Sequence, residues 1–199
     1  SSASAEPEFK RSILDNADFE FWEIYGMTET ACVTAVRYFK GADTAHLGKA
    51  LGKTKVRIAT NTANIVGEIE ILSDCLSETY WGEPARWRDA FTTDGYFKSG
   101  DLGRLDEDQN LFYVGRANES FESGGLMIFP TELETVITEL GGLEDCVVFA
   151  IPNDILGNLI AVVFVASANL ALRDIVNHVR LKLPKHMWPS RFFREDKFP

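Results

Sequence analysis

The strongest constraint on the fold of this 199-residue chain is the alternation of strand-like and helix-like segments in its C-terminal part. Apolar runs at 146–151 and 159–166 are typical of buried strands. Apolar residues recur at helical spacing in 133–140 and 172–179, which predicts two amphipathic helices. Because strands that alternate with helices form a layered unit with its own core, we predict a small α+β or α/β domain over residues 118–199.

Local signals predict how the helices and the last strand of this domain are bounded. Thr131 is followed three residues later by Glu134, which predicts a capping box at the start of the first helix. Gly141-Gly142 is expected to end that helix, and Pro184 to stop the second one. The segment 191–194 is expected to form a final strand.

The first part of the chain, residues 1–117, is expected to be rich in strands, with one short helix near its start. Residues 66–72 alternate between isoleucine and glutamate, the pattern of a half-buried strand. Residues 19–24 predict a strand that enters a turn at Tyr25. The segment 28–39 fits a short helix or a strand, and its pattern does not decide between them.

The composition of the chain disfavours several classes of binding partner. A net charge of −10 disfavours nucleic acid and anionic membrane surfaces as partners. No apolar run is long enough to span a bilayer, so no membrane span is expected. Three widely spaced cysteines fit reduced thiols in a cytoplasmic protein better than a disulfide frame or a zinc site. The oligomeric state is not predicted.

The stretch Tyr25-Gly26-Met27-Thr28-Glu29 places three kinds of ligand-binding group within five residues. A flat ring can stack on Tyr25, and the Thr28 hydroxyl can donate to a phosphate oxygen. Glu29 offers the oxygen ligands that Mg²⁺ prefers. These groups fit a magnesium nucleotide, although the same residues also occur together in ordinary turns.

Three further positions carry groups that suit the same ligand. The carboxylate of Asp101 can accept from both hydroxyls of a ribose, or it can hold its own turn. The planar guanidinium of Arg116 suits a phosphate or ribose edge, or it pairs with a surface acid. Gly124-Gly125 lets the backbone approach a ligand, or it forms a plain hairpin turn.

In their order and spacing, these segments closely resemble the adenylate-forming superfamily. That superfamily includes acyl-CoA synthetases, adenylation domains of peptide synthetases and beetle luciferases. The resemblance extends over nearly the whole chain from Tyr25 to Pro199. The motifs that carry it are Tyr25-Gly26-Met27-Thr28-Glu29, Gly67-Glu68-Ile69, Tyr96-Phe97-Lys98-Ser99-Gly100-Asp101-Leu102-Gly103, Gly115-Arg116, Ser123-Gly124-Gly125 and Pro130-Thr131-Glu132-Leu133-Glu134.

The resemblance implies that residues 1–117 form the end of a large, β-rich AMP-binding domain. It implies that residues 118–199 are most of a small, mobile α+β domain. In such enzymes a carboxylic acid attacks the α-phosphate of ATP, with Mg²⁺, and gives an acyl-adenylate and pyrophosphate. The thiol of coenzyme A, or of a carrier protein, then takes the acyl group. The implied function is therefore that of an AMP-forming acid:CoA ligase.

The resemblance also assigns roles to the first motif. Tyr25 would stack on the adenine, with Gly26 in the same nucleotide-binding stretch. Thr28 would contact the α-phosphate and Glu29 would hold Mg²⁺, which makes these two the candidate catalytic residues.

Later motifs receive the remaining roles. Asp101 would bind the ribose hydroxyls, with Arg116 beside it, and Asn118 would be the hinge between the domains. The loop Ser123-Gly124-Gly125 would face the thiol in the second half-reaction. Glu122 stands where many relatives have lysine, which leaves room for a relative that has lost the second half-reaction.

Two features of the family are expected outside this sequence: the phosphate-binding loop, upstream of Tyr25, and the catalytic lysine, beyond Pro199. We therefore expect the chain alone to be inactive in adenylate formation. Two alternatives to the ligase remain open from the sequence. One is an adenylation module that loads a carrier protein, and the other is a non-catalytic nucleotide-binding relative. The sequence does not predict which carboxylic acid is activated.

Overall fold

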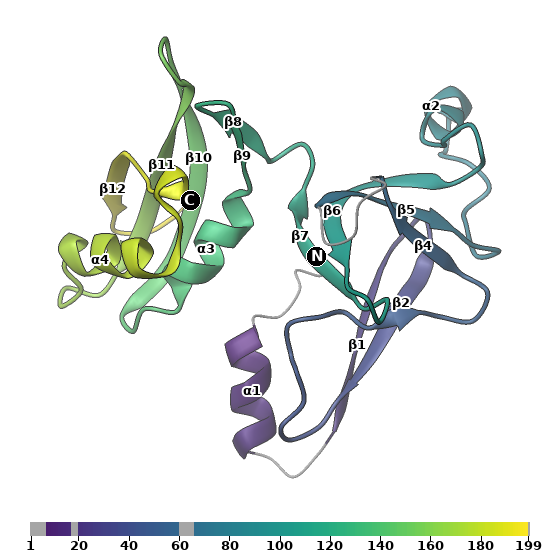
Figure 1. Ribbon diagram of the computed structural model, residues 1–199, viewed down its shortest axis with the longest axis horizontal. Coiled ribbons are helices and arrows are strands. Elements are labelled where there is room, and N and C mark those ends of the chain that lie inside the picture. Colours follow the sequence, from purple (N-terminus) through teal and green to yellow (C-terminus); the bar gives the residue numbers. More distant parts are fainter. Residues whose placement is uncertain (1–6, 17–19, 60–65, 199) are drawn as a thin grey trace. The chain divides into compact units, whose positions relative to one another are not determined.

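The structure is a computed structural model that describes residues 7–16, 20–59 and 66–198 of the chain. It divides into two compact units, Ser1–Ala117 (unit 1) and Asn118–Pro199 (unit 2). Figure 1 labels most elements of both units. Each unit has its own cluster of buried apolar side chains, so each can be understood from its own sequence.

Unit 1 is built mainly from antiparallel strands. Among the described residues its strands form two sheets, with the orders β1-β2-β3 and β4-β5-β6-β7. The elements in chain order are α1 (Pro7–Asn16), β1 (Phe21–Met27), β2 (Ala31–Tyr38), β3 (Lys49–Ala50), β4 (Lys55–Ile58), β5 (Gly67–Leu72), α2 (Pro84–Asp89), β6 (Phe97–Leu105) and β7 (Leu111–Arg116).

The two sheets of unit 1 share one apolar cluster. Tyr25 and Val33 reach it from the first sheet, and Ile69, Ile71 and Leu111 from the second. Both isoleucines of β5 are fully buried, as their alternation with glutamate predicts. The prediction of an exposed opposite face is wrong at Glu70, which is 7% exposed and paired with Arg57 at 2.6 Å.

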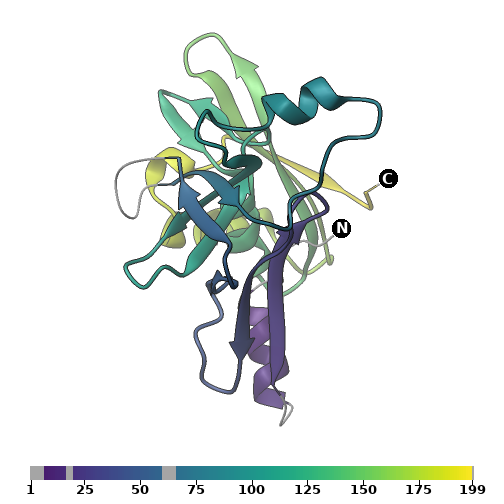
Figure 2. The same ribbon diagram turned by 90° about the vertical axis from the view of Figure 1, so that its right-hand side faces the viewer.

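Helix α1 is fastened to the first sheet by a buried lysine, Lys10, which is 2% exposed. Its Nζ donates to Glu23 Oε2 at 2.5 Å and to the carbonyl oxygen of Thr44 at 3.2 Å. Figure 2 shows α1 beside the long β1–β2 hairpin. A buried charge is tolerated only when paired and hydrogen-bonded, and these contacts meet that condition.

The predicted turn at Tyr25 is wrong, because β1 continues through this residue to Met27. The turn lies at residues 28–30, where the amide of Thr30 donates to the carbonyl oxygen of Met27 at 3.1 Å. The undecided segment after it is strand β2. Pairing with β1 decides the matter, because it gives the backbone groups of both segments their partners.

Unit 2 combines a hairpin, a three-stranded mixed sheet and helices, and this confirms the predicted α+β fold class. In the sheet order β10-β11-β12, β10 is antiparallel to β11, and β12 is parallel to it. The elements are β8 (Phe121–Ser123), β9 (Leu126–Ile128), α3 (Pro130–Thr138), β10 (Leu143–Asn153), β11 (Gly157–Ala166), α4 (Leu172–Lys182), the 3-10 helix η1 (Lys185–Met187) and β12 (Arg191–Glu195).

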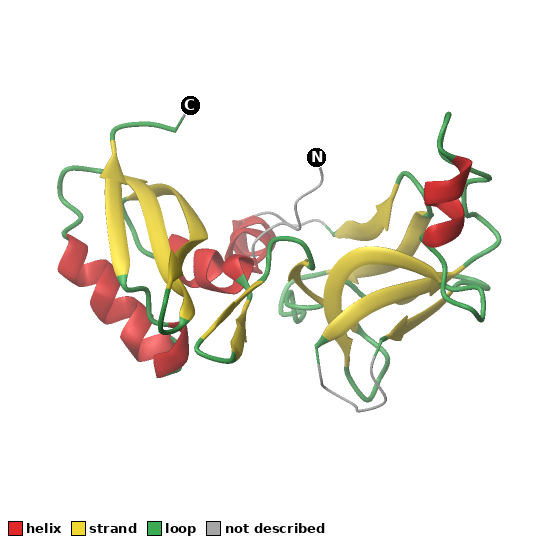
Figure 3. Ribbon diagram, turned by 90° about the horizontal axis from the view of Figure 1, so that it is seen from above, coloured by secondary structure: helices red, strands yellow, loops and turns green. Residues whose placement is uncertain are grey.

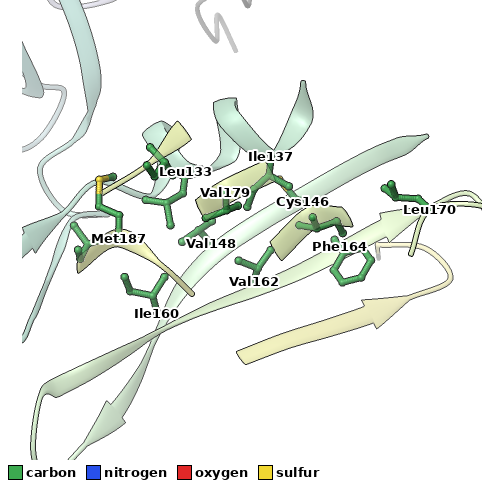
Figure 4. Packing of buried hydrophobic residues seen from close by; sticks show 13 residues of the cluster. Leu133, Ile137, Cys146, Val148, Ile160, Val162, Phe164, Leu170, Val179 and Met187 are labelled. Atoms are coloured by element: carbon green, nitrogen blue, oxygen red, sulfur yellow. The ribbon is translucent and has the colours of Figure 1, made fainter. Parts of the chain in front are cut away.

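The core of unit 2 lies between its sheet and its two α-helices. Figure 3 shows the helices against the sheet, and Figure 4 shows the side chains that meet there. Leu133 and Ile137 come from α3, Val179 from α4, and Val162 from the central strand β11. β11 reads as an almost continuous apolar run, and its alternate residues Ile160, Val162 and Phe164 join the core cluster.

The capping box predicted at Thr131 and Glu134 is wrong. Helix α3 begins at Pro130, its N-cap residue is Phe129, and no side chain caps it. Proline suits the first helical position because its missing N–H would have no partner there. Glu134 instead accepts a hydrogen bond at Oε1 from the amide of Val148 in β10, at 2.8 Å, so this side chain ties the helix to the sheet.

Within residues 7–16, 20–59 and 66–198, no helix has the length and apolar content needed to cross a bilayer.

Candidate functional site

Three of the predicted site residues meet around the carboxylate of Asp101. The hydroxyl of Tyr25 donates to Asp101 Oδ2 at 2.7 Å, and Arg116 Nε lies 3.0 Å from Asp101 Oδ1. Asp101 in β6 and Arg116 in β7 are direct partners in the strand register, and β1 supplies Tyr25. Asp101 is 3% exposed, whereas the side chain of Arg116 is 46% exposed. The result is a desolvated carboxylate with an arginine on its solvent side.

A bulge in β6 presents Asp101 to its partners. The ladder between β5 and β6 passes from the pair Glu70↔Lys98 to the pair Glu68↔Leu102, so one residue of β5 faces residues 99–101 of β6. Bulges of this kind bend a strand and re-aim its side chains, and they are common beside functional sites. Asp101 is the last residue of this bulge.

Tyr25 is buried in the unit 1 core, with 8% of its surface exposed. Burial, and then the charge of Asp101, raise the pKa of the Tyr25 phenol well above its ordinary value. The hydroxyl therefore stays protonated and keeps donating to Asp101. Stacking of Tyr25 on adenine needs an open ring face, and it remains a prediction. The position that the structure shows for Tyr25 is one that supports Asp101.

Gly26 is required by close packing rather than by a turn. A Cβ atom at this position would lie 1.9 Å from the carbonyl oxygen of Ala31 on the neighbouring strand. The strand register also shifts here, between Tyr25 and Gly26. Only a residue without a side chain allows the two backbones to come this close.

Thr28 and Glu29 lie together in the turn that follows β1. Thr28 is exposed, and the hydroxyl of Tyr80 donates to Glu29 Oε1 at 2.9 Å. Ser77 fixes the same turn, because its amide donates to the carbonyl oxygen of Glu29 at 2.8 Å. No cluster of three or more His, Cys, Asp or Glu side chains suited to a metal occurs in the described ranges. Glu29 therefore fits Mg²⁺ only as a single protein carboxylate, with phosphate oxygens completing the shell.

The remaining predicted residues lie in unit 2. Asn118 is exposed and lies two residues after the end of β7. Gly124 and Gly125 have φ values of +60° and +81° and form the turn between β8 and β9. This hairpin is fixed to the start of β11, because Ser123 Oγ donates to the carbonyl oxygen of Asn158 at 2.8 Å. A hinge at Asn118 and a thiol-facing loop remain predictions.

Sequence reasoning assigned no role to three side chains that support the site. Tyr80 binds Glu29, and Glu68 and Ser99 accept hydrogen bonds from backbone amides of the β6 bulge. Glu68 and Ser99 lie inside the motifs quoted for the resemblance, but the resemblance assigned neither residue a role. Their contacts depend on strand register, which local sequence patterns do not fix.

Comparison with known proteins identifies relatives of this chain. Residues 132–199 match the family of AMP-binding enzyme C-terminal domains. The chain is 31% identical over 134 residues to the long-chain-fatty-acid–CoA ligase FadD13 of Mycobacterium tuberculosis, covering 67% of this chain and 26% of that protein. The chain spans between 26% and 41% of the length of the CoA ligases that it matches.

Solved structures show the same fold. ATP-bound MatB from Rhodopseudomonas palustris is 26% identical and has a TM-score of 0.80, over 89% of this chain and 37% of that one. The o-succinylbenzoate CoA synthetase MenE from Bacillus subtilis, solved with an acyl-adenylate, is 21% identical and supports the fold alone, with a TM-score of 0.89 over 100% of this chain and 42% of that one. The chain belongs to the adenylate-forming superfamily and corresponds to its C-terminal portion.

Proposed function

We propose that this chain is part of an AMP-forming acid:CoA ligase, which activates a carboxylic acid with ATP and passes the acyl group to coenzyme A. The observation that carries the proposal is the convergence of Tyr25, Asp101 and Arg116. Two of the matched proteins support it, since one is named a CoA ligase and another was solved with ATP.

In this proposal Asp101 binds the ribose of the nucleotide. Its carboxylate accepts hydrogen bonds from the two ribose hydroxyls, and Tyr25 keeps it fixed through Oδ2. Because Asp101 is almost fully buried, the ribose reaches it from the side of the half-exposed Arg116. The arginine then turns toward the ribose edge or the phosphate, both of which suit its planar guanidinium.

The turn after β1 serves the phosphate in the same proposal. Thr28 is exposed and donates its hydroxyl to the α-phosphate. Glu29, held by Tyr80, supplies one carboxylate to Mg²⁺. An ion held there would supply positive charge beside the phosphate oxygens. Asn118 serves as the hinge, and Ser123-Gly124-Gly125 approaches the thiol.

Titration calorimetry of the chain with AMP tests the proposal. We expect weak binding, with a Kd of about 1 mM, because this portion supplies only some of the groups that contact a nucleotide. Asp101→Ala should weaken binding at least about tenfold, since a charge-assisted hydrogen bond is lost. Asp108→Ala is the matched control, because Asp108 is exposed in the turn between β6 and β7. Equal binding by wild type and Asp101→Ala would contradict the proposal.

A second assay tests the expectation that adenylate formation needs more than this chain. We expect no ATP–pyrophosphate exchange by the isolated chain with any carboxylic acid. The groups assigned above contact the ribose, the α-phosphate and one metal ligand position only. Exchange above the protein-free background would show that the assigned groups are incomplete.

A further inference from the structure

The β6 bulge takes several backbone groups out of the strand ladder, and two side chains supply the partners that the ladder loses. Ser99 Oγ donates to the carbonyl oxygen of Ile69 at 2.6 Å and accepts from the amide of Asp101 at 3.1 Å. Glu68 Oε1 accepts from the amide of Gly100 at 3.0 Å. Buried backbone groups need such partners, and Ser99 and Glu68 supply them at the bulge.

Gly100 occupies a conformation that other residues adopt with strain. Its φ is +73°, in the left-handed region, although a Cβ there would meet no atom within 4 Å. Glycine is therefore required by the backbone angle and not by space. The carbonyl oxygen of Gly100 accepts from the amide of Ala117 at 2.9 Å. Gly100 is thus held from one side by Glu68 and from the other by the last residue of unit 1.

We propose that Glu68 and Ser99 are positioning residues that fix the Gly100 bulge and thereby aim the Asp101 carboxylate at the ribose. The proposal rests on the proposed function, in which Asp101 binds the ribose hydroxyls. Through the Gly100–Ala117 hydrogen bond, the same bulge connects the ribose site to the residue that precedes the predicted hinge.

The contacts favour positioning over sheet stabilisation alone. Each hydrogen bond falls on a bulge residue, and Ser99 contacts the backbone on both sides of the distortion. Ser99 is 8% exposed, so its hydroxyl is committed to these partners. Without the Glu68 acceptor, the Gly100 peptide can rotate, and Asp101 follows it directly along the chain.

The first test measures amide hydrogen exchange in the nucleotide-free 199-residue chain by NMR. Glu68→Ala should raise exchange at Gly100 by about tenfold, because the acceptor of that amide is removed. Glu68→Gln keeps an acceptor oxygen and should stay within about twofold of wild type. Glu107→Ala, in an exposed turn, is the control. Unchanged exchange at Gly100 in Glu68→Ala would overturn the proposal.

The second test compares the affinities of AMP and 2′-deoxy-AMP for each variant. Wild type should prefer AMP by about tenfold, because Asp101 accepts from the 2′-hydroxyl. Glu68→Ala should lose this preference, as Asp101→Ala does, while Glu68→Gln retains it. Ser99→Ala should act in the same direction and serves if Glu68→Ala does not fold.

The outcomes separate the two proposals. If Asp101→Ala loses the preference while both Glu68→Ala and Ser99→Ala keep it, the positioning role is wrong and the proposed function stands. If wild type shows no preference and Asp101→Ala binds AMP as well as wild type, the proposed function fails. In that case the exchange rate at Gly100 still decides whether Glu68 holds the bulge.

Discussion

The two units of this chain differ in what they bury. Seven polar or charged side chains are buried among the described residues, and all seven lie in unit 1. They are Lys10, Thr30, Thr34, Thr44, Glu70, Ser99 and Asp101. The core of unit 2 is instead a cluster of 13 residues without a charged side chain, drawn from its helices, its strands and the segments between them.

This difference means that the two units are stabilised in different ways. Apolar burial stabilises a fold in proportion to area, whereas a buried polar group costs free energy unless a partner is supplied. Unit 1 supplies those partners one by one, as Tyr25 does for Asp101 and Glu23 for Lys10. The stability of unit 1 therefore depends on individual polar contacts. The stability of unit 2 depends on how completely its apolar side chains are buried and packed. Four substitutions test the contrast, from the largest expected effect to the smallest.

The largest effect is expected in the unit 2 core. Leu133→Ala removes a fully buried side chain and should destabilise unit 2 by about 2–5 kcal/mol, because the cavity it leaves closes only in part. Thermal unfolding, with amide hydrogen exchange as the readout, gives the stability of each unit separately. Leu181→Ala is the control, because this leucine in α4 is 86% exposed and should change stability by less than about 0.5 kcal/mol. Equal effects of the two variants would mean that unit 2 lacks the packed core described.

The next effect is expected at Gly26. Gly26→Ala forces a Cβ against the carbonyl oxygen of Ala31 and should cost about 3 kcal/mol, confined to unit 1. Gly141→Ala provides the comparison, since a Cβ there meets no atom within 4 Å. Chemical denaturation of both variants gives the difference. A Gly26→Ala protein as stable as wild type would show that β1 and β2 do not approach this closely.

Removing one hydroxyl tests the polar cluster of unit 1. Tyr25→Phe should cost about 2 kcal/mol in denaturant unfolding, because a buried carboxylate loses one of its hydrogen-bond donors. Tyr80→Phe removes a similar bond to Glu29, but on a less buried carboxylate, and should cost less than about 1 kcal/mol. The ratio between the two losses measures how far burial strengthens the Asp101 contact. Equal losses of stability would show that burial does not strengthen the contact between Tyr25 and Asp101.

The smallest effect concerns pH and a polar contact between the helices of unit 2, formed at Glu139. Burial raises the pKa of Glu139, but hydrogen bonds from Lys182 and His178 outweigh it and bring the pKa below its ordinary 4.5. A lowered folded-state pKa contributes stability above about pH 4.5, and this contribution disappears as the pH falls through the lower folded value. Glu139→Gln should therefore flatten the acid side of the unit 2 unfolding profile and leave unit 1 unchanged. An unchanged acid slope would exclude this contact.

The sequence predicted elements whose pattern is local. β11 and α4 were expected because a buried central strand and an amphipathic helix have distinct periodicities. The turn at Tyr25 and the capping box at Thr131 were wrong, since pairing with β2 and the demands of Pro130 overrode the local signal. Local sequence patterns are least reliable where contacts with another segment determine the structure, as the pairing of β1 with β2 does.

The site shows the same limit more sharply. Tyr25 and Asp101 are 76 residues apart, and only the family resemblance placed them together before the structure did. The bulge that aims Asp101 had no sequence signal beyond Gly100, because a bulge is defined by its partner strand. The sequence therefore did not predict a role for Glu68 or Ser99.

The central claim is that Tyr25, Asp101 and Arg116 form one nucleotide-binding site in unit 1. Its most direct test is an NMR titration of the isotope-labelled chain with AMP up to about 10 mM, a range that detects millimolar binding. The account predicts saturable shift changes concentrated at the amides of Tyr25, Gly100, Asp101 and Arg116. Shifts that are absent from these four amides, or that cluster elsewhere in the chain, would contradict it.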